Sequence, residues 1–374
     1  MINYLILLTA LILTSLNALG QNDKQFKFKI DGTINADTGT VTLHFFTDYI
    51  PKNDSDIVAK VNNGKFSIAG YLPEPQSVII SFGDNYLTSD FIIEKGLQTI
   101  SINTDIERQE PEVSNSTMQN EYPRYTAFFK QHTIKRNICD QKYDSIFKLN
   151  NYTLPEEIRY DMSKELGILY KEHDKLLLTY AEKNPNSEIA FWALARLMIF
   201  GYEPIFDSIF NSFSDQLKNG YAGKVLNTKL MEGKLLTVGK YFPLMSCADI
   251  NSKPFTLDIF KDSRFTLVDF WYSGCGPCRA QFVTLKNLYN QFKNKGFEIV
   301  GLSVDRETDK KKWEDIIINE KLIWQQYWDI NGKDSHRLSI NAFPTNFLVE
   351  NTGKIIAKNI SLGELEEVLS KSLK

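Results

Sequence analysis

The stretch 265–279 constrains the fold of this chain most, because it joins an apolar strand, a tight turn with two cysteines, and a helix. Cys275 and Cys278 lie three positions apart, so a short-range disulfide between them is feasible. Unpaired N–H groups at the start of the helix favour a thiolate at Cys275. Pro277 is tolerated in the first helical turn, where a missing N–H costs nothing. We therefore predict a redox-active pair in which Cys278 resolves a mixed disulfide.

Composition predicts a folded protein with more than one domain. The chain has 374 residues, of which 43% are hydrophobic and 24% charged, a balance typical of globular proteins. Because a single core rarely serves a chain of this length, we expect two or three domains. The formal net charge is −3, and the short lysine run at 310–312 fits a solvated helix face, so we expect no nucleic-acid partner.

The first twenty residues have the pattern of a targeting segment. Residues 2–16 form an apolar run, and small residues follow at Ala18 and Gly20, as signal peptidase requires. We predict a signal peptide at 1–20, a mature chain that begins at Gln21, and export to the periplasm. The alternative is an uncleaved anchor in the inner membrane, since no Lys or Arg precedes the run. Only in that case would the protein contact the membrane.

The cysteine content excludes a scaffold held together by disulfides. The chain has four cysteines, whereas small exported folds of that kind are much richer in them. Cys139 and Cys247 are remote from each other and from the pair at 275–278. We interpret both as buried apolar side chains in preference to a bridge between them.

Two regions precede the segment with the cysteine pair. Over 21–110, apolar and polar residues alternate with a period of two, and turn signals separate the runs. This pattern predicts an all-β, sandwich-like domain or an open barrel. A polar linker is expected over 106–116. Over 118–235 the apolar spacing is helical, and we predict an α-helical spacer or a homodimerisation surface. We find no catalytic grouping in either region.

From 237 to 374, strand and helix patterns alternate. Strand-helix-strand units produce parallel strands with helices on both faces of the sheet. The site is expected at the carboxyl ends of the strands, where Cys275 falls. The expected strands are 265–271, 297–304, 345–350 and 354–359, and the expected helices are 275–293, 311–321 and 362–372.

With these motifs in place, residues 237–374 resemble the thioredoxin superfamily, and more closely its exported TlpA/ResA-like reductases of the AhpC/TSA type. The matching motifs are Val268-Asp269-Phe270-Trp271, Cys275-Gly276-Pro277-Cys278, and Phe343-Pro344-Thr345 followed by Asn346-Phe347-Leu348-Val349. The segment between Asp305 and Asp329 resembles the insertion that distinguishes these exported members. The resemblance implies a thioredoxin fold with protein-disulfide oxidoreductase activity, preceded by an uncharacterised β-rich domain.

The resemblance also implies roles for individual residues. Cys275 would be the attacking thiolate and Cys278 the resolving thiol. Asp269 would be a buried carboxylate that exchanges a proton with Cys278. Trp271 is expected to pack under the active-site loop. Pro344 corresponds to a cis-proline that exposes backbone to an extended substrate peptide.

The expected substrate-binding surface departs from the family pattern at two positions. The residues expected to form this substrate-binding surface are Trp271, Gly274, Phe343, Pro344 and Thr345. Gly274 stands where the family commonly has Trp, which we expect to open the site. Thr345 stands where reductases that serve cytochrome c maturation often have an acid, which argues against an assignment to haem attachment.

The redox-active disulfide would be the sole cofactor, without a metal. Because Gly-Pro between the cysteines resembles reducing thioredoxins, we expect reduction of protein disulfides, with electrons from a membrane donor. A peroxiredoxin-like peroxidase is the second hypothesis, although it needs a Thr in the turn before Cys275, where the chain has Trp-Tyr-Ser-Gly. A zinc site would need two further ligands. A non-enzymatic envelope protein-binding module would leave the cysteine pair and Asp269 without a purpose.

Overall fold

The computed structural model describes residues 25–46, 49, 56–83, 86–106, 112–150 and 155–374. The predicted signal peptide lies outside these residues. The chain divides into two compact units. The first comprises the described residues up to Phe128 together with Asn219–Val225, and the second comprises Phe129–Lys218 and Leu226–Lys374.

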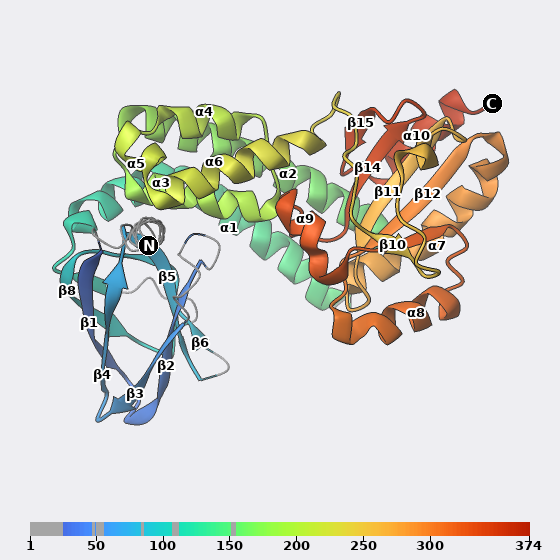
Figure 1. Ribbon diagram of the computed structural model, residues 1–374. Helices are drawn as coiled ribbons and strands as arrows, with labels where there is room; N and C mark the ends of the chain where they lie inside the picture. The colour runs from blue at the N-terminus through green and yellow to red at the C-terminus, as the bar shows by residue number, and fades with distance from the viewer. Residues whose placement is uncertain (1–24, 47–48, 50–55, 84–85, 107–111, 151–154) are drawn as a thin grey trace, which may run out of the picture. The chain divides into compact units, whose positions relative to one another are not determined.

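The first unit is built on a nine-stranded sheet, as its period-two pattern predicts (Figure 1). The strands are β1 (Phe26–Ile34), β2 (Thr38–Phe45), β3 (Ile57–Asn62), β4 (Lys65–Leu72), β5 (Gln76–Phe82), β6 (Tyr86–Leu87), β7 (Phe91–Ile93), β8 (Gly96–Ile102) and β9 (Glu112–Ser114). Their order is β6-β5-β2-β3-β4-β1-β8-β9, with β7 paired to β5. The β1–β8 pair is parallel, and the other pairs are antiparallel.

This sheet curves around a single apolar core. Alternate residues of β1, Phe28 and Ile30, are 1% and 0% exposed and share one cluster with residues of β2 through β8. The Tyr86 hydroxyl on the end strand β6 also donates to the carbonyl of Asn103, just beyond β8. The strand β9 falls within the predicted linker, so that prediction is wrong over 112–114, where the chain pairs with β8.

The region between the two sheets is helical, as predicted. Its helices are α1 (Glu121–Leu149), α2 (Glu156–Lys183), α3 (Glu188–Leu197), α4 (Ile205–Ser212), α5 (Asp215–Asn219) and α6 (Tyr221–Gly233). Ser187 starts α3 by accepting a hydrogen bond from the Ala190 N–H, which satisfies one of the free amides of the first turn. Across the described part of the chain, no helix combines the length and apolar character that a membrane span requires.

The second sheet carries the cysteine pair and has the order β10-β13-β12-β11-β14-β15 (Figure 1). Its strands are β10 (Ala248–Asp249), β11 (Phe265–Trp271), β12 (Phe297–Ser303), β13 (Gln325–Trp328), β14 (Thr345–Glu350) and β15 (Ile355–Lys358), and its helices are α7 (Gly276–Phe292), α8 (Lys310–Asn319), α9 (Lys333–Arg337) and α10 (Leu362–Ser372). The strands β11, β12 and β13 are parallel, and β14 is antiparallel to β11. This arrangement is the thioredoxin fold that the sequence predicts.

Both faces of this sheet are covered, and β11 contributes to a core on each face. Leu267 and Trp271 belong to one cluster together with both cysteines and residues of α7, α8 and α10. Val268 and Phe270 belong to the cluster on the opposite face. Because successive side chains of a strand point to opposite faces, Asp269 points to the same face as Leu267 and Trp271. The buried acid and the cysteine helix α7 therefore share one side of the sheet.

Candidate active site

The cysteine loop connects β11 to α7 and is ordered by the start of the helix. Cys275 is the N-cap residue, and its Sγ accepts a hydrogen bond from the Cys278 N–H at 3.1 Å. The two residues form a disulfide with their Cα atoms 5.3 Å apart. Both are almost fully buried, at 2% and 1% exposure. The first sulfur thus occupies the position where free helix amides stabilise negative charge once the disulfide is reduced.

Asp269 is buried on the same side of the sheet as this helix, and one of its two carboxyl oxygens has no hydrogen-bond partner among the described residues. It is 3% exposed, and the oxygen without a partner is Oδ1. Burial raises the pKa of Asp269 to about 7, because the ionised form loses its hydration. A carboxyl group with this pKa accepts or releases a proton near neutral pH, as acid-base chemistry requires.

Trp271 supports the loop from below. It is 1% exposed, its ring packs edge-on against Phe282 of α7 at 5.2 Å, and its Nε1–H donates to the Gln326 side chain at 3.1 Å. Any effect of Trp271 on substrate binding therefore acts through the loop.

Asp305 fixes the loop and is a residue that sequence reasoning missed. Its carboxylate accepts hydrogen bonds from the Ser273 N–H at 2.9 Å and 3.1 Å, and from the Ser273 hydroxyl at 2.6 Å. The Ser303 hydroxyl adds another at 2.7 Å. Asp305 is 4% exposed and follows the carboxyl end of β12. The sequence signal for Asp305 was an acidic residue just after a strand that is parallel to the cysteine strand, because sites form at the carboxyl ends of such strands.

The predicted substrate loop comes to the same edge of the sheet because of strand register. Phe270, near the end of β11, pairs with Thr345 at the start of β14, so the residues just before Thr345 lie beside the cysteine loop. The Phe343–Pro344 peptide bond is cis. The Thr345 hydroxyl donates to the Ala342 carbonyl at 2.8 Å, and the residue is 8% exposed. Thr345 thus bonds to its own loop, whereas Phe343 and Pro344 are partly exposed.

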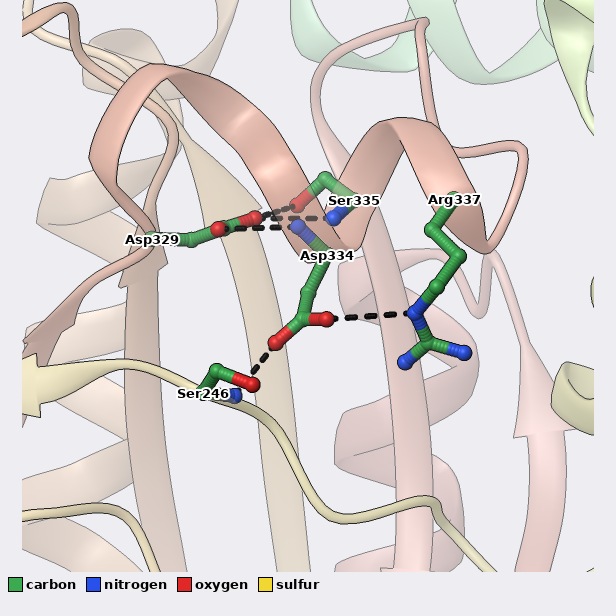
Figure 2. Close-up of polar contacts among 5 residues, drawn as sticks. All are labelled: Ser246, Asp329, Asp334, Ser335 and Arg337. Atoms are coloured by element: carbon green, nitrogen blue, oxygen red, sulfur yellow. Dashed lines mark hydrogen bonds and ion pairs between the residues drawn. The ribbon is translucent and has the colours of Figure 1, made fainter. Parts of the chain in front are cut away.

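A second buried acid, Asp329, organises the approach to this loop (Figure 2). It follows β13 and accepts hydrogen bonds from the backbone N–H groups of Asp334 and Ser335, at 3.0 Å and 2.8 Å, and from the Ser335 hydroxyl. Asp334 in turn accepts from the Ser246 N–H and pairs with Arg337. These contacts fix α9, which precedes the cis-proline segment. The sequence reading did not identify Asp329 as a site residue.

The aromatic ring of Tyr272 lies close to Gly274. A Cβ atom on Gly274 would lie 3.1 Å from Cε2 of Tyr272, so the ring of Tyr272 occupies the neighbouring space. That ring also packs edge-on against Phe343, with centroids 5.6 Å apart. Gly274 itself is exposed, so the expectation that it opens the site stays a prediction.

The remaining cysteines take no part in this site. Cys139 and Cys247 are free and buried. Cys247 belongs to the cluster on the opposite face of the sheet from Cys275, and burial raises its pKa to about 12, which keeps it a thiol. Within the described ranges, no group of three or more His, Cys, Asp or Glu side chains could hold a metal ion.

A thioredoxin-type sheet, a disulfide at the N-terminus of a helix and a cis-proline loop beside it define a thiol-disulfide oxidoreductase. Comparison with known families agrees with this class. Residues 238–358 match the AhpC/TSA family, and residues 28–122 match a domain of unknown function, DUF4369. Residues 238–358 are therefore similar to the AhpC/TSA family over about the last third of the chain.

Individual relatives carry two kinds of name. Thiol-disulfide oxidoreductase ResA of Bacillus thuringiensis is 29% identical over 139 residues, which cover 36% of this chain and 79% of that protein. A peroxiredoxin of Thermotoga petrophila is 30% identical over 92 residues, which cover 25% of this chain and 42% of that protein. The crystal structure of the thioredoxin domain of a thiol-disulfide oxidoreductase from Bacteroides vulgatus is 32% identical, with a TM-score of 0.34, and covers 37% of this chain and 99% of that one.

Proposed function

We propose that the chain reduces disulfide bonds in other proteins through Cys275 and Cys278. The observation that carries the proposal is the placement of Cys275 as the N-cap of α7, in a disulfide with Cys278, on the face of the sheet to which the buried Asp269 points. This arrangement supplies an attacking sulfur, a resolving sulfur and a proton acceptor.

The reaction proceeds in two exchanges from the dithiol form. The Cys275 thiolate attacks one sulfur of the substrate disulfide, the substrate S–S bond breaks, and the other substrate sulfur leaves as a thiolate. Cys278 then loses its proton to Asp269 and attacks the Cys275 sulfur, which breaks the mixed disulfide and releases the second substrate sulfur as a thiolate that takes up a proton, while Asp269 returns its proton to solvent. The enzyme ends with the Cys275–Cys278 disulfide and has given up two electrons. A donor thiol pair must restore the dithiol.

Reduction of insulin disulfides, with dithiothreitol as the donor, tests this proposal. The change Cys275→Ser removes the attacking sulfur, so turnover should fall to the level of dithiothreitol alone. The change Cys278→Ser leaves the mixed disulfide without a resolving thiol, so a covalent complex should accumulate on non-reducing gels. The matched control is Cys247→Ser, a buried thiol on the opposite face, which should form the same complexes as the unchanged protein. Full turnover by the Cys275→Ser protein would contradict the proposal.

Peroxidase activity is the second candidate, because the AhpC/TSA match and the peroxiredoxin relative favour it. The hydroxyl in the turn before Cys275 is that of Ser273, and it donates to Asp305, which leaves it a poor choice for orienting a peroxide. Hydrogen peroxide turnover that persists in the Cys278→Ser protein would favour the peroxidase.

We place this activity in the periplasm, with a membrane protein as the electron donor. The support for export is the sequence pattern of residues 1–20. Fractionation of cells that produce the full chain tests the location. Recovery of the protein in the cytoplasm with its N-terminus uncleaved would contradict it.

A further inference from the structure

The surface beside Cys275 combines aromatic rings with a positive charge. A Cβ atom on Gly274 would lie 3.1 Å from the Tyr272 ring and 3.7 Å from the Lys312 Nζ. Tyr272 is 38% exposed and packs against Phe343. Gly274, next to the attacking cysteine, thus lies between the ring of Tyr272 and the ammonium group of Lys312.

Packing of the inserted helix holds Lys312 at this position. The next residue, Trp313, is 1% exposed and stacks on Trp328, with centroids 5.8 Å apart and planes at 26°. The Nε1–H of Trp328 donates to the Asp305 carbonyl at 2.8 Å, and the carboxylate of Asp305 holds the cysteine loop. The helix α8 and the loop are therefore joined through buried groups, and the place of Lys312 beside Gly274 follows from this packing.

Lys312 differs from its neighbours in lacking an acidic partner. Lys310 lies 3.8 Å from Glu314, and Lys311 lies 2.5 Å from Asp315. No acidic side chain within the described ranges pairs with Lys312. Acids four residues after a lysine stabilise a helix, but Ile316 occupies that position after Lys312, and the Lys312 Nζ lies near the cysteine loop. Its charge is available to a group that arrives from solution.

We propose that Lys312 and the Tyr272–Phe343 ring pair form the binding surface for the substrate chain beside Cys275, and that this surface selects disulfides flanked by Asp or Glu. The inference rests on the proposed function and specifies its substrate class. The rings contact the substrate chain through their exposed faces, and the ammonium group pairs with the carboxylate. An exposed ion pair contributes a few-fold difference in rate, and salt screens it.

The test uses three peptides with one intramolecular disulfide that differ only at the residue before the first cysteine, which is Glu, Gln or Lys. The measured quantity is the second-order rate constant for reduction by the full-length dithiol protein. At low salt we expect the Glu peptide to react about three to five times faster than the Gln peptide, and the Lys peptide to be the slowest. In 1 M salt the Glu:Gln ratio should approach one.

Substitutions assign the preference to Lys312. In Lys312→Gln the Glu:Gln ratio should fall to about one, and in Lys312→Glu the order of the Glu and Lys peptides should reverse. The matched control is Lys311→Gln. Lys311 is the residue before Lys312 and pairs with Asp315, so this variant should keep the Glu:Gln ratio of the unchanged protein. Tyr272→Ala should slow all three peptides, and Tyr272→Phe should restore their rates.

The outcomes separate this inference from the proposed function. Equal rates for the three peptides in a protein that reduces insulin would overturn the substrate preference alone. An equal loss for all peptides in Lys312→Gln would also overturn it, because the lysine would then act on the cysteine rather than on the substrate. Failure to reduce either the peptides or insulin would overturn the proposed function itself.

Discussion

Both units bury carboxyl groups, and a comparison of one group from each unit shows a difference in hydrogen bonding. In the β-rich unit, Glu94 is 7% exposed and accepts hydrogen bonds from the Thr117 N–H, at 2.9 Å and 3.2 Å, and from the hydroxyls of Ser116 and Thr117. In the thioredoxin-like domain, Asp269 is 3% exposed, and its Oδ1 has no partner among the described residues. The first group has the contacts of a structural cap, whereas the second has the environment of a proton acceptor.

This difference shows how burial separates structural from chemical acids. A buried carboxyl group that accepts several hydrogen bonds is compensated for its lost hydration and holds the backbone in place. A buried carboxyl group without donors costs the fold stability whenever it ionises. Asp305 belongs to the first kind, although it lies in the same domain as Asp269. The kind of acid is therefore set by its hydrogen-bond donors and not by the fold around it.

The largest expected effect is a gain in stability from Asp269→Asn. The folded pKa of about 7 lies above the ordinary value of 3.8, so the native state holds its proton more tightly than the unfolded state. Stability therefore falls as pH rises from about 4 to about 7, by about 4 kcal/mol at about 1.4 kcal/mol per pKa unit. The Asn variant lacks this loss, so its advantage should be near zero at pH 4 and largest above pH 7.

Tryptophan fluorescence during urea unfolding measures this effect in the correct unit. All five tryptophans lie between residues 129 and 374, so the signal reports the second unit alone. A difference in unfolding free energy between the unchanged protein and the Asn variant that does not change with pH would show that burial does not raise the pKa of Asp269. The contrast between Asp269 and the hydrogen-bonded Glu94 would then fail.

The same substitution should slow the resolving step about a hundredfold, within the range of general acid-base catalysis. Asp269 must be ionised to take the proton from Cys278, so the rate in the unchanged protein should rise with pH through about 7. The Asn variant should lose this rise. Stopped-flow release of the second substrate thiol measures the step, and Thr266→Val, a buried change on the same strand, is the matched control. An unaltered pH profile in the Asn variant would contradict the role.

The smallest expected effect comes from Glu94→Ala. Removing the carboxylate leaves the Thr117 N–H without its acceptor, at a cost of about 2 kcal/mol. Hydrogen exchange measured by mass spectrometry should show faster exchange around residues 112–121, with insulin reduction unaltered. Glu112→Ala, an exposed acid on β9, is the control and should change neither. A fall in reductase activity in the Glu94 variant would assign the β-rich unit a part in the reaction.

Elements with strong local signals could be predicted from the sequence. β11, β14 and α10 were predicted to the residue, because each strand is rich in apolar residues and the helix has a clear start in the capping box at Ser361 and Glu364. The strand β13 and the helix α9 were missed. They span four and five residues, too short to show a period. The strand β9, at three residues, was taken for a linker for the same reason.

The site could be predicted in part. The cysteine pair was recognised because its spacing and position are local features of the chain. Asp305 was missed, because only the parallel pairing of β12 with β11 brings it beside the cysteine loop. The role of Tyr272 was missed because nothing in the sequence states which side chain fills the space beside a glycine. The pairing of two strands decided the first case, and the packing of the Tyr272 ring on Phe343 decided the second.

The anchoring of Ser273 by Asp305 has a consequence for turnover. The loop before the two cysteines is hydrogen-bonded to Asp305, which follows β12, by contacts that involve neither cysteine. We therefore expect the loop to keep its conformation in both the dithiol and the disulfide form. The disulfide form would then bind substrate proteins about as tightly as the dithiol form. Rapid reduction of the Cys275–Cys278 disulfide by the donor, rather than weaker binding by the disulfide form, would then keep oxidised molecules from occupying substrate proteins.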